Sequence, residues 1–352
     1  KVVQIYNLAK LFGVEVIDRL QLILEIFSKH ASTTEAKLQI ELARLRYELA
    51  HAREKVRLAK MGEQPGFYGL GRYEVDVYYN AIKRRIASIN ATLRRIRRKS
   101  IIYRQMRREM GYPLVSLAGY TNAGKTELFN ALAHEQKLVS DALFTTLSTT
   151  TRLVDFAGRR AFLTDTVGFI ERLPILLVEA FKTTLEETVF SDLIILVVDA
   201  ADELEDIRRK ALCSLEVLGE IGASDKPLVV ALNKIDLITR SKVEEAMEVL
   251  SFLKHPVVPI SAKRGTNLDV FCRVVAENLP RYEMLEMEVP SKEQSLLSHI
   301  HSVMHVLSRE DRGAFTTLVA EAPKNLARKL AARVVRCGGS VRWVDAAQSG
   351  GA

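Results

Sequence analysis

The chain has 352 residues, of which 48% are hydrophobic, and its Lys and Arg residues outnumber its Asp and Glu residues by eight. This length favours two to four domains over a single core. No apolar run approaches the roughly 20 residues that span a bilayer, so we expect no membrane partner. The three widely spaced cysteines exclude a disulfide framework and a zinc motif.

The first third of the chain predicts two long helices. Two series of apolar residues follow an alternating spacing of four and three, which is the 3.5-residue period of a coiled-coil seam. Between the series, Pro65 and four glycines interrupt the helical pattern over 60–74. We therefore predict an antiparallel coiled-coil hairpin over 32–110, with arms of roughly 40–50 Å and a Gly-rich tip at 60–74. The seam residues are Leu38, Leu42, Leu45, Leu49, Ala52, Val56 and Ala59, then Ile82, Ile86, Ile89, Leu93 and Ile96.

The positive charge is concentrated in the second helix of this hairpin. Between Lys83 and Glu109, eleven Lys or Arg residues stand against one acidic residue, so this segment accounts for the whole excess. A solvated helix face is the alternative interpretation, but such a face usually mixes both signs. The imbalance favours a phosphate-rich partner. The candidate RNA contacts are Arg94, Arg95, Arg97 and Arg98.

From Tyr112 onward, short apolar runs alternate with helical patterns. Runs of this kind indicate strands that are buried on both faces of a mainly parallel sheet. We expect these strands in LVSLAGY, RAFLTD, LIILVVDA, LVVALNKID and VVPISA. The tail predicts a small α/β domain with a strand over 284–289, a helix from Ser291, a strand in GAFTTLVAE, a helix in KNLARKLAARVV and a last strand in SVRWV.

The turn after the first of these strands fits the pattern G-x-x-x-x-G-K-[ST] and opens a helix. In this context backbone N–H groups cradle phosphate oxygens at a helix N-terminus. Lys125 would neutralise the β- and γ-phosphates, and the Thr126 hydroxyl would ligate Mg²⁺. A chance match in a loop is the alternative. The predicted phosphate-binding residues are Gly119, Tyr120, Thr121, Asn122, Ala123, Gly124, Lys125 and Thr126.

Three further motifs stand where strands of the predicted sheet end. The Asp165 carboxylate would join the Mg²⁺ shell indirectly, through a bridging water, and the Gly168 N–H would meet the γ-phosphate. The Asp236 carboxylate can accept from N1–H and the 2-amino group of guanine, whereas adenine would leave it unpaired. Each motif alone is common at helix starts, but four in order predict a GTP site in a doubly wound sheet. The motifs comprise Asp165, Thr166, Val167 and Gly168; Asn233, Lys234, Ile235 and Asp236; and Ser261, Ala262 and Lys263, whose backbone would close over the guanine O6.

These motifs and their surroundings resemble the HflX family of ribosome-associated GTPases, within the Obg–HflX group. GYTNAGKT resembles the family's phosphate loop, DALFTTLSTTTR its first switch, LTDTVGFIERLP its second, and VIDRLQLILEIFSKHASTTEAKLQIELARLRYEL the entry into its helical hairpin. The resemblance implies a remnant of the N-terminal domain at 1–31, the hairpin at 32–110, a G domain at 111–281 and a small C-terminal α/β domain at 282–352.

The resemblance also implies an activity and partners. The family hydrolyses GTP and acts on the large ribosomal subunit and its rRNA near the peptidyl-transferase centre. It functions in subunit maturation or in ribosome splitting and recycling. We therefore expect a monomer on the ribosome, with other assembly factors as further partners. Thr146 matches the first-switch threonine that ligates Mg²⁺, which makes Lys125, Thr126, Thr146, Asp165 and Gly168 the candidate catalytic set. Phe144, Thr145, Thr146, Leu147 and Ser148 would wrap the nucleotide.

The chain departs from the family pattern at several places. Only GLGRYEVD survives of the acidic tip motif, with Glu74 and Asp76 at the matching positions, and Ser148 and Thr149 replace an Asp-Pro pair. From the resemblance we also expect most of the N-terminal domain to be absent. These departures favour a divergent organellar member in the mitochondrial matrix, with the cytoplasm as the alternative.

Phe169 stands where many GTPases place a water-positioning glutamine. A phenyl ring cannot orient water, so we expect slow intrinsic hydrolysis that the ribosome activates; a packing role for this ring is equally compatible. Asn122 lies where related GTPases hold K⁺, although such asparagines also brace turns. The rival function is a binding module that uses GTP as a clamp on the large subunit without turnover.

Overall fold

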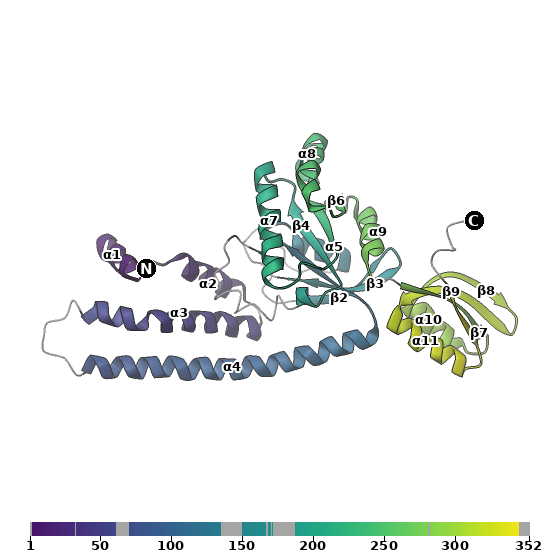
Figure 1. Cartoon of the computed structure of the whole chain (residues 1–352), viewed down its shortest axis with the longest axis horizontal. Coiled ribbons are helices and arrows are strands. Elements are labelled where there is room, and N and C mark those ends of the chain that lie inside the picture. Colours follow the sequence, from purple (N-terminus) through teal and green to yellow (C-terminus); the bar gives the residue numbers. More distant parts are fainter. Residues whose placement is uncertain are drawn as a thin grey trace.

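The computed structural model describes residues 2–31, 33–60, 70–134, 150–166, 168, 169, 171, 187–280 and 282–344. A helical hairpin, a central α/β domain and a C-terminal domain follow one another along the longest axis (Figure 1). Within the described residues, no helix is long and apolar enough to cross a membrane.

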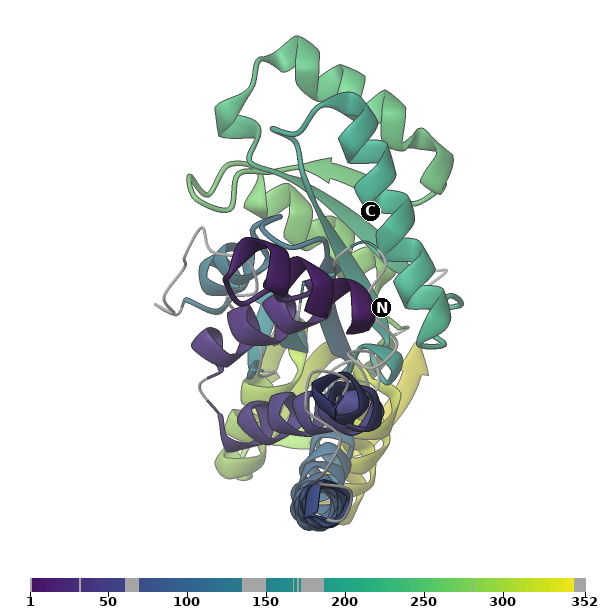
Figure 2. The ribbon, with the colours of Figure 1, turned by 90° about the vertical axis from the view of Figure 1, so that its left-hand side faces the viewer.

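The helices α3 (Thr34–Lys60) and α4 (Leu70–Met110) form the hairpin, which Figure 2 shows nearly end-on. They run antiparallel, as two contacts show: Arg85 of α4 donates to both carboxylate oxygens of Glu41 in α3, at 2.7 and 3.0 Å, and the earlier Tyr78 donates to the later Glu48 at 3.4 Å. The tip predicted over 60–74 is too long, since α4 already begins at Leu70. Gly71 lies in the first turn of α4, where the N–H groups have no intrahelical partner in any case.

The predicted seam accounts for only one of the two buried faces of α3. Leu42 of α3 and Ile82 and Ile89 of α4 are buried, as the 3.5-residue period predicts. A second face of α3, which includes Ala36 and Ile40, joins a hydrophobic cluster with α2 (Arg19–His30) and the central sheet. The segment predicted as an N-terminal remnant therefore contributes α2 to the core of the central domain, and α1 (Val2–Phe12) precedes it.

The central domain is built on a six-stranded sheet in the order β2-β3-β1-β4-β5-β6, parallel except for the β2–β3 pair. The helices α2, α7 and α8 pack on one face, and α5 and α9 on the other. This arrangement confirms the predicted doubly wound fold, but β2 was not predicted. The elements are β1 (Leu114–Gly119), α5 (Lys125–Ala133), β2 (Thr150–Phe156), β3 (Arg159–Asp165), β4 (Leu193–Asp199), α7 (Leu204–Glu220), β5 (Leu228–Asn233), η1 (Ile235–Leu237), α8 (Arg240–Leu250), η2 (Ser251–Leu253), β6 (Val257–Pro259) and α9 (Leu268–Asn278).

The C-terminal domain is a four-stranded antiparallel sheet in the order β10-β7-β9-β8. Its two helices share one hydrophobic core with the strands. The predicted strands and helices of the tail are present, and β8 is an additional strand that the pattern did not predict. The elements are β7 (Tyr282–Pro290), α10 (Gln294–Val303), β8 (His305–Arg312), β9 (Phe315–Pro323), α11 (Lys324–Arg336) and β10 (Ser340–Val344).

Polar contacts fix the C-terminal domain against the β2–β3 ribbon. Arg159 donates to both carboxylate oxygens of Glu321, at 3.0 and 3.1 Å, and to the carbonyl oxygen of Ala276 at 2.9 Å. The Tyr282 hydroxyl donates to the carbonyl oxygen of Arg160 at 2.7 Å. The Glu321 side chain is only 11% exposed, so this ion pair is largely shielded from water.

Candidate nucleotide-binding site

The predicted phosphate loop joins β1 to α5, as its motif requires. Gly119 and Gly124 have φ angles of +140° and +91°, a region that side chains disfavour. A Cβ atom on Gly124 would lie 2.2 Å from Nδ2 of Asn233, so only glycine fits there. The loop leads into the N-terminus of α5, whose first N–H groups have no intrahelical acceptor and suit a phosphate.

Lys125 is buried inside this loop. Its ammonium group donates to the carbonyl oxygens of Gly119 and Tyr120, at 3.1 and 2.8 Å. Burial lowers the pKa of Lys125 to about 8, and the nearby Asp165 carboxylate partly offsets this effect. Bound phosphates would add negative charge beside the ammonium group and favour its protonated form. The loop therefore offers a cation where the β- and γ-phosphates are predicted.

Thr126 and Asp165 bring two hard oxygen ligands together. The Thr126 hydroxyl donates to Oδ2 of Asp165 at 3.1 Å, and Asp165 is fully buried at the end of β3. A hydroxyl and a carboxylate beside a phosphate loop suit Mg²⁺, which prefers oxygen ligands and retains several waters. The residues present therefore fit this ion. The third predicted ligand, Thr146, lies outside the described residues, together with Phe144, Thr145, Leu147, Ser148 and Val167.

The second predicted switch begins in direct contact with the phosphate loop. A Cβ atom on Gly168 would lie 3.0 Å from the Lys125 ammonium and 2.9 Å from Cγ2 of Thr121, which explains the glycine. The N–H of Phe169 donates to the Gly119 carbonyl at 3.0 Å, and the N–H of Thr121 donates to the Phe169 carbonyl at 2.9 Å. The Thr166 hydroxyl donates to the carbonyl oxygen of Leu117 at 2.5 Å.

Phe169 packs its ring into the hydrophobic cluster formed by α2, α7, α8 and one face of the sheet. The residue is 2% exposed, so the packing interpretation of this position is observed. A buried ring is also unable to orient an attacking water. The two interpretations of Phe169 are therefore compatible.

The predicted guanine-binding motifs meet at the ends of β5 and β6. Asn233 is buried, donates to the Ala123 carbonyl at 3.1 Å and accepts from the Ala262 N–H at 3.0 Å. It thereby fixes the phosphate loop against the last motif. Asp236 is exposed on η1 and accepts from the Ser261 hydroxyl at 2.6 Å, which orients its carboxylate.

A partly buried ion pair that the motifs did not predict braces the phosphate loop. The Lys234 ammonium lies 2.6 Å from Oδ2 of Asp199 and donates to the Asn122 carbonyl at 2.8 Å. Asn122 and Lys234 both have positive φ angles, 64° and 68°. Asp199 is the last residue of the buried strand β4, which pairs with β5. Its position at the end of a buried strand is the sequence signal that could have assigned Asp199 to the site. Of the remaining predicted residues, Ile235 begins η1 and Lys263 is exposed.

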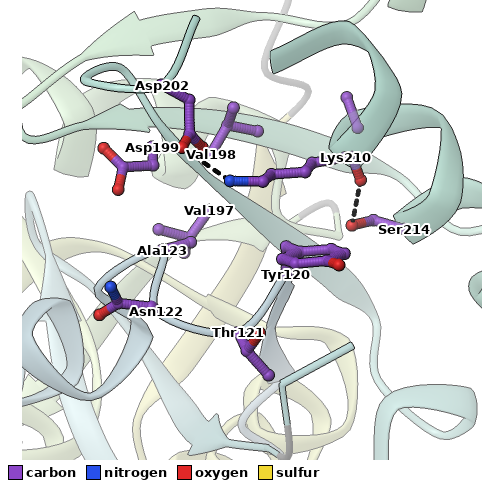
Figure 3. A pocket seen from close by; sticks show the side chains of 11 residues that line it. Tyr120, Thr121, Asn122, Ala123, Val197, Val198, Asp199, Asp202, Lys210 and Ser214 are labelled. Carbon is purple, nitrogen blue, oxygen red and sulfur yellow. Dashed lines mark hydrogen bonds and ion pairs between the residues drawn. The ribbon is translucent and has the colours of Figure 1, made fainter. Parts of the chain in front are cut away.

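Tyr120 lines a small cavity on the side of the loop that faces α7 (Figure 3). Lys210 of α7 lies 2.6 Å from Oδ1 of Asp202, and its ammonium is 5.4 Å from the centre of the Tyr120 ring. The cavity holds about 50 Å³, which is far below the several hundred Å³ of a typical ligand pocket. The Tyr120 side chain therefore supports the phosphate loop on the side that faces α7.

A further ion pair connects the hairpin to the residues beside both switches. Arg107 of α4 donates to both carboxylate oxygens of Glu187, at 2.9 and 3.2 Å, and to the Thr151 hydroxyl at 2.9 Å. The Thr151 hydroxyl lies 2.9 Å from that of Thr164, which precedes Asp165 in β3. From the sequence, Arg107 was predicted only as one charge of the basic segment.

The fold and this constellation define a P-loop GTPase. Residues 114–234 match the family described as "50S ribosome-binding GTPase", residues 30–107 match "GTP-binding GTPase Middle Region", and residues 1–28 match "GTP-binding GTPase N-terminal". The chain is 49% identical over 277 residues to the GTPase HflX of Methanocaldococcus jannaschii, which covers 78% of this chain and 68% of that protein.

Two further proteins are similar to this chain. The GTPase HflX of Thermococcus kodakarensis is 44% identical over 319 residues, covering 87% of this chain and 72% of that protein. A GTP-binding protein from Sulfolobus solfataricus, solved with GDP, is 34% identical, covers 75% of this chain and 73% of that chain, and superposes with a TM-score of 0.47. The chain belongs to the HflX family of GTPases; it binds GTP and GDP and hydrolyses GTP.

Proposed function

We propose that this GTPase binds the large ribosomal subunit and its rRNA near the peptidyl-transferase centre, and acts in the maturation of that subunit, in ribosome splitting and recycling, or in both. GTP would hold the bound state and hydrolysis would release it. The matched family description, "50S ribosome-binding GTPase", supports this partner.

The observation that carries the proposal is the exposed basic face of α4. Arg94, Arg95, Arg97 and Arg98 are all exposed, and no acidic residue lies between Lys83 and Arg108. A long helix with exposed charges of one sign suits the phosphate backbone of RNA. The helix also contacts Thr151 and Glu187 through Arg107, so one element connects the proposed RNA surface to residues beside the switches.

We further propose Mg²⁺ as the resident ion, with Thr126 and Asp165 as its described protein partners and Thr146 as the third. The ion would neutralise charge on the β- and γ-phosphates. Lys125 adds a second positive charge at the same phosphates, and Gly168 brings a backbone N–H to the γ-phosphate. The compartment, the mitochondrial matrix or the cytoplasm, and the participation of other assembly factors stay predictions.

The first test removes the positive charge from α4. Replacing Arg94, Arg95, Arg97 and Arg98 with Gln is expected to weaken binding to large subunits. The slope of log K against log salt concentration should become shallower by about three to four. GTP affinity should not change, because these residues lie outside the nucleotide site. Unaltered particle binding at several salt concentrations would show that the face is only solvated.

The rival function, a GTP-dependent clamp without turnover, differs in one measurement. The proposed enzyme releases phosphate repeatedly when large subunits are saturating, whereas a clamp releases at most one phosphate per bound particle. The bond between Thr126 and Asp165, together with the buried Lys125 ammonium that interacts electrostatically with this carboxylate, favours turnover.

A second prediction concerns a monovalent cation beside Asn122. The Lys234 ammonium already braces the loop through the Asn122 backbone carbonyl, and the exposed Asn122 side chain makes no hydrogen bond to another described residue. A K⁺ ion held there would stabilise negative charge that develops between the phosphates. Hydrolysis on saturating large subunits should therefore be faster in K⁺ than in Na⁺ at equal ionic strength, and Asn122→Ala should abolish the difference. Identical rates in the two salts would contradict the K⁺ site.

A further inference from the structure

The C-terminal domain carries a second surface with charges of one sign. Residues 324–344 contain six Lys or Arg residues and no Asp or Glu. The helix α11 buries its apolar residues, such as Leu330 and Val334, in the core of the domain. The opposite face of the helix is exposed and basic, and consists of Lys324, Arg328, Lys329, Arg333 and Arg336.

Three of these arginines are available to a partner. Lys324 lies 3.7 Å from Glu283, but Arg328, Arg333 and Arg336 form no ion pair with another described residue. At 1.5 Å per residue, Arg328 and Arg336 are about 12 Å apart along the helix axis. Charges spread over this length can contact more than one phosphate of a nucleic-acid strand.

An exposed aromatic side chain lies on the same side of the sheet as α11. Trp343 in β10 is 47% exposed. Val341, two residues earlier, packs against the core that α11 covers, and alternation along the strand places Trp343 on that same face. β10 is an edge strand, so the indole is accessible beside the domain's helical layer. Arginines combined with an aromatic face suit bases as well as phosphates.

The end of α4 meets the start of α11. A Cβ atom on Gly111, which follows α4, would lie 3.0 Å from Cβ of Leu326. Figures 1 and 2 both show α4 and α11 along the lower side of the molecule. The C-terminal end of the basic segment of α4 and the N-terminal end of α11 are therefore neighbours in space, although more than 200 residues separate them in sequence.

We infer that the exposed face of α11, together with Trp343, is a second RNA-binding surface that extends the α4 surface. The inference rests on the proposed function for its biological setting. A membrane fits less well than RNA, because α11 buries Leu326, Leu330 and Val334 in the domain and leaves Val335 as its one exposed large hydrophobic residue among the described residues. The cluster of arginines favours RNA over an acidic protein, and the test separates these two partners.

The test uses the full chain with deproteinised large-subunit rRNA. The variant Arg328→Gln/Arg333→Gln/Arg336→Gln is expected to bind this RNA more weakly, with a slope of log K against log salt that is shallower by about two to three. Trp343→Ala should weaken binding by roughly 5- to 150-fold through lost stacking, with no change of slope. A matched control, Lys242→Gln/Lys254→Gln/Lys292→Gln, removes the same charge from exposed positions elsewhere and should retain RNA affinity.

Unchanged affinity and slope in the α11 variant would overturn the inference. A variant that loses binding to intact large subunits but not to bare rRNA would identify an acidic protein as the partner and also overturn it. The α4 variant, measured in parallel, separates the two hypotheses: if it alone loses RNA, only the α11 surface is wrong, and if neither loses RNA, the proposed function fails as well.

Discussion

Asp236→Asn is expected to reduce GTP affinity by on the order of 10²- to 10⁴-fold, because two hydrogen bonds to a charged acceptor are lost and each contributes about 1.5–3 kcal/mol. The Ser261 hydroxyl, 2.6 Å from Oδ1, holds the carboxylate in one orientation, so the variant amide should occupy the same place. An amide can donate to a 2-oxo group, and affinity for xanthosine triphosphate should rise.

Competition between the two nucleotides, measured at equilibrium, checks this prediction. Asp225→Asn is the matched control, since Asp225 is exposed and lies outside the site; it should bind GTP as the unmodified chain does. Equal GTP affinity in Asp236→Asn would mean that the base is recognised elsewhere.

Arg107→Ala is expected to lower the free energy of unfolding by about 3 kcal/mol. Truncating one partner of a buried pair typically costs about 3–5 kcal/mol, because the other charge stays buried. The lower end applies here, since the Arg107 side chain is 21% exposed while that of Glu187 is 8% exposed. Urea unfolding in the absence of nucleotide measures the change.

Arg85→Ala provides a control within the same helix. Arg85 forms an equally well aligned pair with Glu41, but both side chains are largely exposed, at 54% and 38%. Its removal should cost less than about 1 kcal/mol. Adding Glu187→Gln to Arg107→Ala should recover part of the stability by removing the buried charge. Equal losses in Arg85→Ala and Arg107→Ala would show that burial does not distinguish the two pairs.

The sequence predicted the parts of this fold that periodicity and short motifs describe. The buried strands β1, β4 and β5 are nearly continuous apolar runs, and the phosphate and guanine motifs stand at their ends. By contrast, β8 is mostly exposed and charged, so its residues lack the apolar alternation that identifies a strand. β2 was missed because its threonines were assigned to the first switch.

Contacts between distant segments were harder to predict than elements. The Lys234–Asp199 and Arg107–Glu187 pairs join residues 35 and 80 positions apart, and no local pattern distinguishes such residues from other surface charges. The basic face of α11 was hidden for a related reason: acidic residues elsewhere in the chain cancel its charge in a whole-chain total.

The position of Arg107 near one end of α4 gives the hairpin the geometry of a lever. Leu70, where α4 begins, lies 37 residues before Arg107, or about 55 Å away at 1.5 Å per residue. A rotation of α4 by only about 5° around its anchored end would move the far end of that helix by about 5 Å. A tilt of this size at the contacts of Arg107 with Thr151 and Glu187 would therefore displace the other end of the helix by about the length of one helical turn.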